Sequence, residues 1–545
     1  MQAVSLKKFF DSGTLFVWMC GAGLALSLLM IGGLLALIFI NGMGYFWPKD
    51  LVQFTLHDGS YVLGEVTGHE VIHDSVNADS PEGKGRIQLK VGNRDLYGLD
   101  FRWIDESHIQ AQSTPTDVVF LERREWGNFY GRPHRVMQGD SVVASGHQEA
   151  TTALFPLIDR ANEIHEDIHY LERSVIGDIN HEIEAQRLSL RALELEGRAN
   201  QSEVATREQE VAVLQSRYEA EADKLRVLYT QLEEYSVVLE DVNGTTKELA
   251  VGQIIRMLQP NAMGVGEKVW AYLGNVWTVL SEEPREANTE GGIFPAIFGT
   301  VLMVLIMSIA VVPFGVLAAV YLKEYATQGA LVRIVRIAVN NLAGVPSIVF
   351  GVFGLGFFVY AVGGSIDALF FPEALPNPTF GTGGMLWASL TLALMTVPVV
   401  IVATEEGLSA VPREYREGSL ALGATKLESL LRVVIPCAMP GILTGLILAI
   451  SRATGEVAPL MLTGVVKLAP SMPLDGTFPF LHLDRKFMHL GFHIYDVGFQ
   501  SPNVEAAKPM VYVTTLILVG VVIILNLAAI SIRNRMRRKY AGSTI

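Results

Sequence analysis

Six long apolar runs are the feature that most constrains what this chain can fold into. The first, Thr14–Ile40, holds 27 residues without a charged side chain, and a helix of that length crosses a hydrocarbon core of about 30 Å with some tilt. Lys7 and Lys8 precede it, as in a secretory signal, but the run is too long for a signal and no small-residue cleavage site follows. Residues 1–48 are therefore expected to form a tail and a retained first span. Five more spans are expected near residues 293–321, 337–363, 385–404, 438–465 and 509–532.

The positions of lysine and arginine predict which side of the membrane each loop faces. Five basic residues crowd the C-terminal tail between Arg533 and Lys539, and such clusters mark the cytoplasmic side. Six crossings return the chain to its starting side, so both termini are expected in the cytoplasm. The basic loop 405–437 then faces the cytoplasm as well, and residues 49–290 lie outside.

Charge divides the chain into two parts of different character. The net charge is −14, but residues 49–290 carry 42 acidic and 23 basic side chains, a net of −19, whereas the other residues carry 14 and 19, a net of +5. An acidic, water-soluble block is thus inserted into a basic, apolar protein. The overall negative charge argues against binding to nucleic acid.

The first part of the inserted block is expected to be mainly β. Over residues 49–156, apolar alternation surrounds two turn dipeptides, Asp58-Gly59 and Gly92-Asn93, which are typical of paired antiparallel strands. We therefore predict a β-rich unit directly after the first span.

The second part of the block changes period. Over residues 157–241 apolar side chains recur every seven residues, and Gly197 interrupts the pattern midway. We therefore expect two helical arms that fold back on each other as an antiparallel coiled coil. Residues 242–290 are expected to be mixed β and loop. The heptad positions of the second arm are Val204, Val211, Tyr218, Leu225, Leu232 and Leu239, with Leu214, Leu228 and Tyr235 between them.

Two H-E-x-x-H sequences suggest zinc, because histidines four apart on a helix can share a metal. The first, His69 to His73, lies in strand-like sequence, where residues four apart are about 13 Å apart. The second, His165 to His169, lies on the helical arm, with its apolar neighbours on the buried seam. Its histidines are therefore expected to point to the flank or to solvent, with no evident third ligand. The two cysteines lie in separate apolar runs. No metal site and no cofactor are expected.

The basic loop carries a motif between two spans. A short polar helix through Glu417, Gly418 and Ser419 is followed by Gly423, and the chain re-enters the membrane at Pro436. Gly423 is expected to end this helix in a conformation that a β-branched residue would strain. The spacing resembles the Glu-Ala-Ala loop of ABC-importer permeases. That resemblance implies that these five residues couple the spans to an ATPase subunit.

The fifth apolar run contains an arginine and a glutamate four residues apart, Arg452 and Glu456. On one helix these two side chains share a face, and charges inside a membrane usually mark a pathway. An arginine can bind an oxyanion through two parallel hydrogen bonds, with the glutamate holding it in place. A purely structural ion pair remains the alternative.

The sequence around this pair narrows the resemblance. Four stretches together resemble the permeases of the phosphate-specific transport system, PstA type. They are Arg452–Leu460, Gly291–Thr300, Leu342–Ser347 and Leu420–Ala424. The resemblance implies an all-α polytopic fold of six spans, the type I ABC-importer permease fold, over residues 291–545 and the first span. The large β and coiled-coil insertion is outside it.

The resemblance also implies a function and partners. The chain would be the permease subunit of an ATP-driven importer of inorganic phosphate. Its partners would be a second permease of PstC type, two ATPase subunits of PstB type and a periplasmic phosphate-binding protein. No Walker A sequence occurs, so no catalytic residue is expected in this chain. The alternatives are transport of another oxyanion, molybdate or sulfate, and a membrane sensor or scaffold that acts through the coiled coil.

Overall fold

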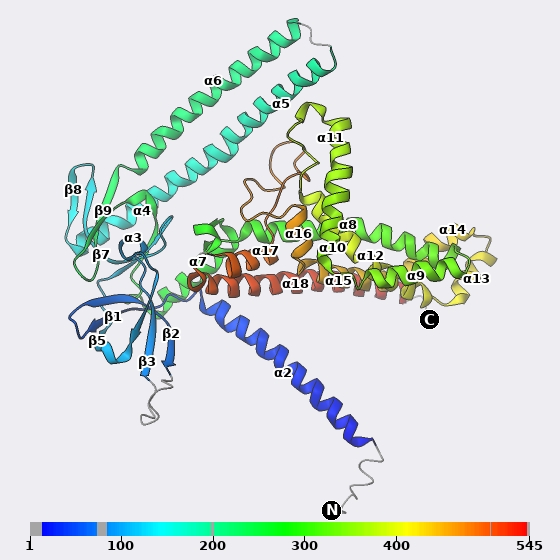
Figure 1. Ribbon diagram of the computed structural model, residues 1–545, viewed down its shortest axis with the longest axis horizontal. Helices are drawn as coiled ribbons and strands as arrows, with labels where there is room; N and C mark the ends of the chain where they lie inside the picture. The colour runs from blue at the N-terminus through cyan, green and yellow to red at the C-terminus, as the bar shows by residue number, and fades with distance from the viewer. Residues whose placement is uncertain (1–12, 73–83, 198–200, 502, 542–545) are drawn as a thin grey trace, which may run out of the picture.

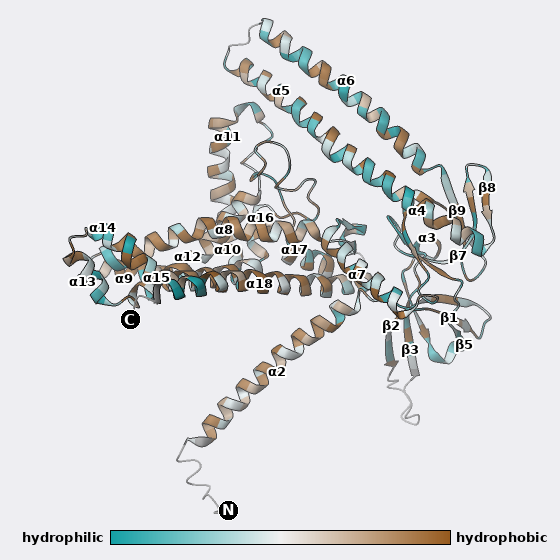
Figure 2. Cartoon of the chain, turned by 180° about the vertical axis from the view of Figure 1, so that it is seen from behind, coloured by the Kyte–Doolittle hydropathy of each residue, from teal (hydrophilic) through white to brown (hydrophobic). Residues whose placement is uncertain are grey.

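The computed structural model describes residues 13–72, 84–197, 201–501 and 503–541. In this part of the chain six helices are long and apolar enough to cross a membrane, and Figure 2 shows them as the hydrophobic part of the molecule. The lysines near the N-terminus, Lys7 and Lys8, lie outside the described residues. The spans are built on α2 (Thr14–Gly44), α8 (Phe294–Val320), α10 (Ser347–Phe353) with α11 (Gly364–Phe370), α12 (Met385–Ser409), α15 (Ile435–Thr454) and α18 (Val504–Ala541).

Helix α12 is the centre of the helical bundle. Two-thirds of its most apolar stretch is buried, and its core side chains, such as Leu392, pack against Met303 of α8 and Ala449 of α15. Small residues let these helices approach closely. A Cβ on Gly441 of α15 would lie 2.6 Å from the Cα of Gly407 of α12. By contrast, the most apolar stretch of α2 is not buried by the rest of the protein. This helix extends away from the bundle, which it approaches only near one end of α18 (Figure 1).

Two of the expected spans begin or end elsewhere. The third was placed at 337–363, but α9 (Ala330–Leu342) is a separate helix and the span runs over Ser347–Phe370. The break falls at Pro346, which disfavours helical geometry in the residue before it. The fifth span, expected at 438–465, runs over Lys426–Thr454 instead. Gly455 ends it, and α16 (Ala458–Thr463) follows as a separate short helix.

The inserted block contains two antiparallel sheets, and the first follows the turn signals only in part. Asp58 accepts a hydrogen bond from the Ser60 N–H at 2.9 Å in a tight hairpin between β1 and β2. The Gly92-Asn93 turn instead leads into the short helix α3 (Arg94–Tyr97), after which β4 pairs with β3. The order is β4-β3-β2-β1-β5. The strands are β1 (Leu51–Leu56), β2 (Tyr61–Ile72), β3 (Lys84–Lys90), β4 (Phe101–Asp105) and β5 (Ile109–Ser113).

The second sheet carries the helical hairpin. Its order is β10-β9-β7-β6-β11, and β8 pairs with β7. The two arms leave the sheet after β8, run antiparallel, and return into β9 (Figure 1). The first arm is α4 (His147–Tyr170), which continues through π-helical Leu171–Ile176 into α5 (Gly177–Leu195), and the second arm is α6 (Gln201–Leu232). The strands of this sheet are β6 (Val119–Arg123), β7 (Phe129–Gln138), β8 (Ser141–Ser145), β9 (Tyr235–Glu240), β10 (Thr246–Ala250) and β11 (Ile254–Leu258).

The hairpin bounds differ from the expected range of 157–241. The first arm begins ten residues earlier, because Ala150, Leu154 and Ile158 pack on the second sheet. The second arm ends at Leu232, and the expected heptad residues Tyr235 and Leu239 lie on strand β9. A seven-residue spacing is compatible with both assignments over so short a stretch, and strand pairing with β7 decides between them. Heptad packing between the arms stays a prediction.

A helix of 17 residues, α7 (Val265–Ser281), replaces part of the β and loop structure expected over 242–290. Glu267 caps it by accepting a hydrogen bond from the Gly264 N–H at 2.8 Å. Its buried face packs through Val279 on Phe46, at the end of the first span. This helix therefore packs on the end of the first span and on the start of the second, although it lies before the expected boundary at 290.

Candidate substrate path and coupling loop

The first predicted site lies where the fifth span is interrupted. Arg452 is in the last turn of α15, where the helix dipole favours a cation, but Glu456 is outside the helix, between α15 and α16. The expectation that both residues share a helical face is therefore wrong. The glycine at 455 permits the interruption, and the Glu456 N–H still donates to the Ala453 carbonyl at 3.3 Å. The turn nevertheless brings the Glu456 carboxylate close to the Arg452 guanidinium.

The two charged groups face each other at a distance too long for a hydrogen bond. Arg452 Nε lies 3.7 Å from Glu456 Oε1, and the side chains are 32% and 22% exposed. Among the described residues the guanidinium has no hydrogen-bond acceptor, so both Nη nitrogens are available to a ligand. A half-exposed, loosely paired arginine is suited to exchanging a carboxylate partner for an oxyanion.

Neighbouring contacts hold the interruption in place. Ser451 donates to Asn526 Oδ1 of α18 at 3.0 Å, which joins the end of α15 to the last span. A Cβ on Gly351 of α10 would lie 2.7 Å from the Cα of Pro459 of α16. The turn that bears Arg452 and Glu456 is thus fixed from both sides by close helix packing.

The second predicted site is the loop between α12 and α15. Helix α13 (Arg413–Ala421) is followed by Gly423 with φ +88°, so the expected left-handed conformation is confirmed. Thr425 then caps α14 (Lys426–Ser429), and Glu428 completes the capping box by accepting from the Thr425 N–H at 2.9 Å. The glycine and the box together set the angle between the two short helices.

The predicted coupling residues have different surroundings. Glu417 and Gly418 are exposed on α13. Ser419 is half-buried, donates to the Arg416 carbonyl at 2.8 Å and is hydrogen-bonded to the Ser429 hydroxyl. Pro436 does not mark the start of the span, because the helix is continuous from Lys426. The π-helical stretch Leu430–Val434 precedes this proline and accommodates its missing N–H.

Two ion pairs near this loop were not anticipated from the sequence. Arg416 of α13 pairs with Glu324 at 3.1 Å, at the end of the second span, and Arg336 of α9 pairs with Glu405 of α12 at 3.2 Å. Residues this far apart in sequence carry no local signal of such pairing. The first pair clamps the loop to the second span, and the second pair joins α9 to α12. The exposed surface of the loop carries four leucines among charged side chains: Leu420, Leu422, Leu427 and Leu431.

Neither H-E-x-x-H sequence forms a metal site among the described residues. His69 lies on strand β2, and His73 is outside the described residues. His165 was expected to point to the flank or solvent, but its Nε2 is 3.0 Å from the Gly252 carbonyl, in the short 3₁₀ turn between β10 and β11. Burial of the imidazole and the nearby Arg124 guanidinium lower the pKa of His165. Its role is to dock the hairpin on the sheet.

Comparison with known proteins identifies a family for the C-terminal membrane part of the chain. Residues 311–541 match the family of the binding-protein-dependent transport system inner membrane component. The probable ABC transporter permease protein YqgI of Bacillus subtilis is 32% identical over 245 residues, which are 44% of this chain and 76% of that protein. The probable phosphate transport system permease protein PstA of Methanocaldococcus jannaschii is 32% identical over 221 residues, 40% of this chain and 67% of that protein.

Other matches cover less of the protein compared. The phosphate transport system permease protein PstA 1 of Mycobacterium tuberculosis is 36% identical over 199 residues, and the match spans 36% of this chain and 59% of that protein. The solved MetNI methionine ABC transporter is 18% identical, covers 50% of this chain and 99% of the matched chain, and has a TM-score of 0.34. On the matches with YqgI and the Methanocaldococcus protein, the chain belongs to the PstA-type family of ABC transporter permeases.

Proposed function

We propose that this chain is the permease subunit of an ATP-driven importer that moves inorganic phosphate into the cytoplasm. The observation that supports it most is the half-exposed Arg452–Glu456 pair at the interruption of the fifth span. A guanidinium with free Nη nitrogens presents the planar fork that fits two oxygens of a phosphate. The family match over residues 311–541 includes this pair, and two relatives named as phosphate transport permeases are 36% and 32% identical to the chain.

We further propose the type I importer arrangement, with partners on both sides of an inner membrane. The exposed leucines of the coupling loop, around Leu422, would enter a groove on an ATPase subunit of PstB type. Two such subunits, a PstC-type permease and a periplasmic phosphate-binding protein would complete the complex. This places the loop and both chain ends in the cytoplasm and the inserted block outside. Because Arg416 and Lys426 clamp the loop to the second span, ATPase motion would reach the spans as a rigid-body movement.

The function is tested by transport in proteoliposomes that contain the complete complex. ATP-dependent uptake of radioactive phosphate is expected, and excess arsenate should compete with it because arsenate has the same tetrahedral shape and charge. Uptake of sulfate or molybdate in place of phosphate would contradict the choice of substrate. Normal phosphate uptake by cells that lack this chain would contradict a transport role and favour the scaffold alternative.

The inserted block should be separable from transport if it is cut at the right place. The Leu51 N–H donates to Asn261 Oδ1 at 2.8 Å, so the chain enters and leaves the two sheets at one point. A variant that joins Asp50 to Asn261 through a short Gly-Ser linker keeps α7. We expect this variant to insert, assemble and import phosphate.

The matched control removes α7 as well, from Leu51 to Ser281. It should fail to accumulate in the membrane, because Val279 would no longer cover Phe46 at the end of the first span. Both variants are followed by membrane fractionation and by uptake. If the shorter deletion assembles into the complex but transports nothing, the block takes part in the mechanism.

A further inference from the structure

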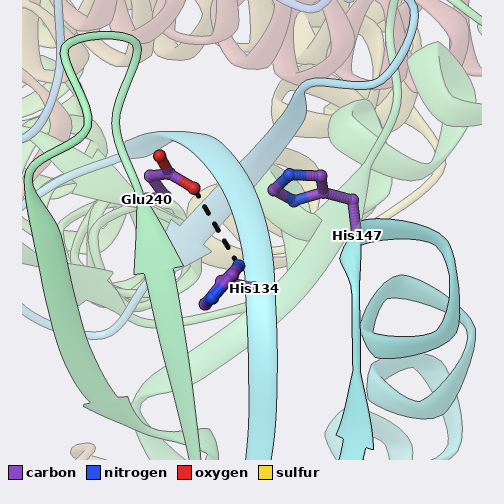
Figure 3. Close-up of side chains that lie close together, drawn as sticks. All are labelled: His134, His147 and Glu240. Carbon is purple, nitrogen blue, oxygen red and sulfur yellow. Dashed lines mark ion pairs between the residues drawn. The ribbon is translucent and has the colours of Figure 1, made fainter.

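Three metal-ligating side chains meet where the helical hairpin leaves the second sheet. His134 comes from strand β7, His147 is the first residue of α4, and Glu240 is the last residue of β9. One ligand atom from each residue lies within 4.8 Å of the other two. Figure 3 shows the three side chains facing a common space between the strands and the start of the helix. The sequence analysis missed this group, because the three residues share no motif.

An irregularity in the sheet directs His134 toward this space. The pairing of β7 with β9 shifts register between Pro133 and Arg135, so His134 is the extra residue of a β-bulge. Such bulges redirect a side chain and are frequent next to functional sites. The bulge is tied to the hairpin as well, because the Gly146 N–H donates to the His134 carbonyl at 3.0 Å. The backbone thus holds His134 and His147 next to each other, with ring centres 5.8 Å apart.

The hydrogen bonds leave each ligand atom free to bind. Nδ1 of His147 lies 2.9 Å from the Pro133 carbonyl, which can only accept, so Nδ1 carries the proton and Nε2 keeps its lone pair. This arrangement, with the second ring nitrogen bonded to a carbonyl, is usual for histidines that ligate metals. Nδ1 of His134 is buried and has no hydrogen-bond partner among the described residues. It faces Glu240 Oε2 at 4.0 Å.

Glu240 makes no ion pair with an arginine or a lysine among the described residues. Its cross-strand neighbour is Arg132, which is bound instead by Asp117 through its Nε and Nη2 nitrogens. Among the described residues, the buried Nδ1 of His134 thus has no hydrogen-bond partner, and it lies next to the Glu240 carboxylate and the Nε2 lone pair of His147. A buried polar atom without a partner costs free energy. A cation would satisfy all three groups together.

We propose that His134, His147 and Glu240 bind a divalent transition-metal ion of the zinc class. Two imidazoles and one carboxylate are a donor set that zinc accepts, with water in the fourth position. Tetrahedral ligands around zinc are about 3.3 Å apart, so small side-chain rotations close the present spacing. The ion would join β7, β9 and the first turn of α4, and would fix the base of the hairpin to its sheet.

Zinc binding to the full-length protein in detergent, with any affinity tag removed, tests the proposal. After chelator treatment, titration with ZnCl₂ against a chromogenic chelator should give one site per chain. His147→Ala and Glu240→Gln should each weaken binding by more than about tenfold, at least the cost of losing an outer-shell partner. Cobalt in place of zinc should give the strong visible absorption of a tetrahedral site, and both variants should lose it.

The matched control is His169→Ala, which removes the exposed H-E-x-x-H histidine of the same helix. It should bind zinc as the wild-type protein does. Thermal unfolding without metal shows whether each variant is folded, and zinc should raise the unfolding temperature of the wild type and the control alone. Equal zinc binding by wild type, His147→Ala and Glu240→Gln would overturn the proposal. Loss of binding in the control alone would overturn it too.

Discussion

Replacing Gly423 by valine is expected to reduce ATP-driven phosphate uptake to background while the protein still inserts into the membrane. Gly423 adopts φ +88° between α13 and α14, and a β-branched residue in the left-handed region costs about 1–3 kcal/mol. The loop is exposed at this point, so relaxation of the strain should shift α13 rather than unfold the spans. Transport would fail because the exposed leucines of the loop no longer meet the ATPase. Uptake and membrane protein level are measured together.

Two controls distinguish backbone strain at Gly423 from a general effect of replacing an exposed glycine. Gly423→Asn should keep most of the uptake, because asparagine tolerates the left-handed conformation better than other residues. Gly329→Val replaces another exposed glycine on the same side of the bundle, at φ −140°, where valine is not strained. It should transport normally. Normal uptake by Gly423→Val would contradict the proposal that this loop couples the spans to an ATPase subunit.

Changes at Arg452 are expected to have the second large effect. Arg452→Ala should reduce uptake to background with normal protein level, and Arg452→Lys should lower it about tenfold. Lysine keeps the charge but loses the planar fork, and a tenfold loss corresponds to about 1.4 kcal/mol, about one charge-assisted hydrogen bond. Because the pair is half-exposed and 3.7 Å apart, Glu456→Gln should also leave the helix folded.

The Arg336–Glu405 pair is a matched control. It joins α9 to α12 at 3.2 Å with side chains 38% and 20% exposed, close to the values for Arg452 and Glu456. If the reduced uptake of Arg452→Lys is not caused by loss of an ion pair as such, Arg336→Lys should keep most of the uptake. The charge swap of Arg452 and Glu456 distinguishes the structural alternative. An anion site predicts no rescue, because glutamate at 452 repels phosphate, whereas a structural bridge predicts restored uptake.

Local signals in the sequence predicted the geometry of the loop between α12 and α15 better than that of the turn with Arg452 and Glu456. A glycine after a short polar helix predicts a left-handed residue wherever it occurs, and Gly423 has that conformation. The shared helical face of Arg452 and Glu456 was wrong, because Gly455 ends the helix between them. A single glycine is tolerated inside many helices, so its effect depends on whether neighbours such as α10 and α18 stabilise the interruption.

The tertiary structure alone could show the ion pairs and the histidine cluster. Arg416 meets Glu324, and His134 meets His147 and Glu240, only after helices and strands far apart in sequence have packed. The redirected side chain of His134 depends on a bulge, which arises from pairing with β9 and has no local signature.

The sequence by itself determined that the chain has six apolar helices and one large acidic insertion. Hydrocarbon leaves no alternative to a helix for a run such as Thr14–Ile40, because every backbone group must be bonded within the run. In the water-soluble block the same backbone groups could be satisfied by helix, strand or solvent. There the bounds of the hairpin, the strand at Tyr235 and helix α7 were decided by tertiary packing, since only contacts with the sheet or the spans distinguish these alternatives.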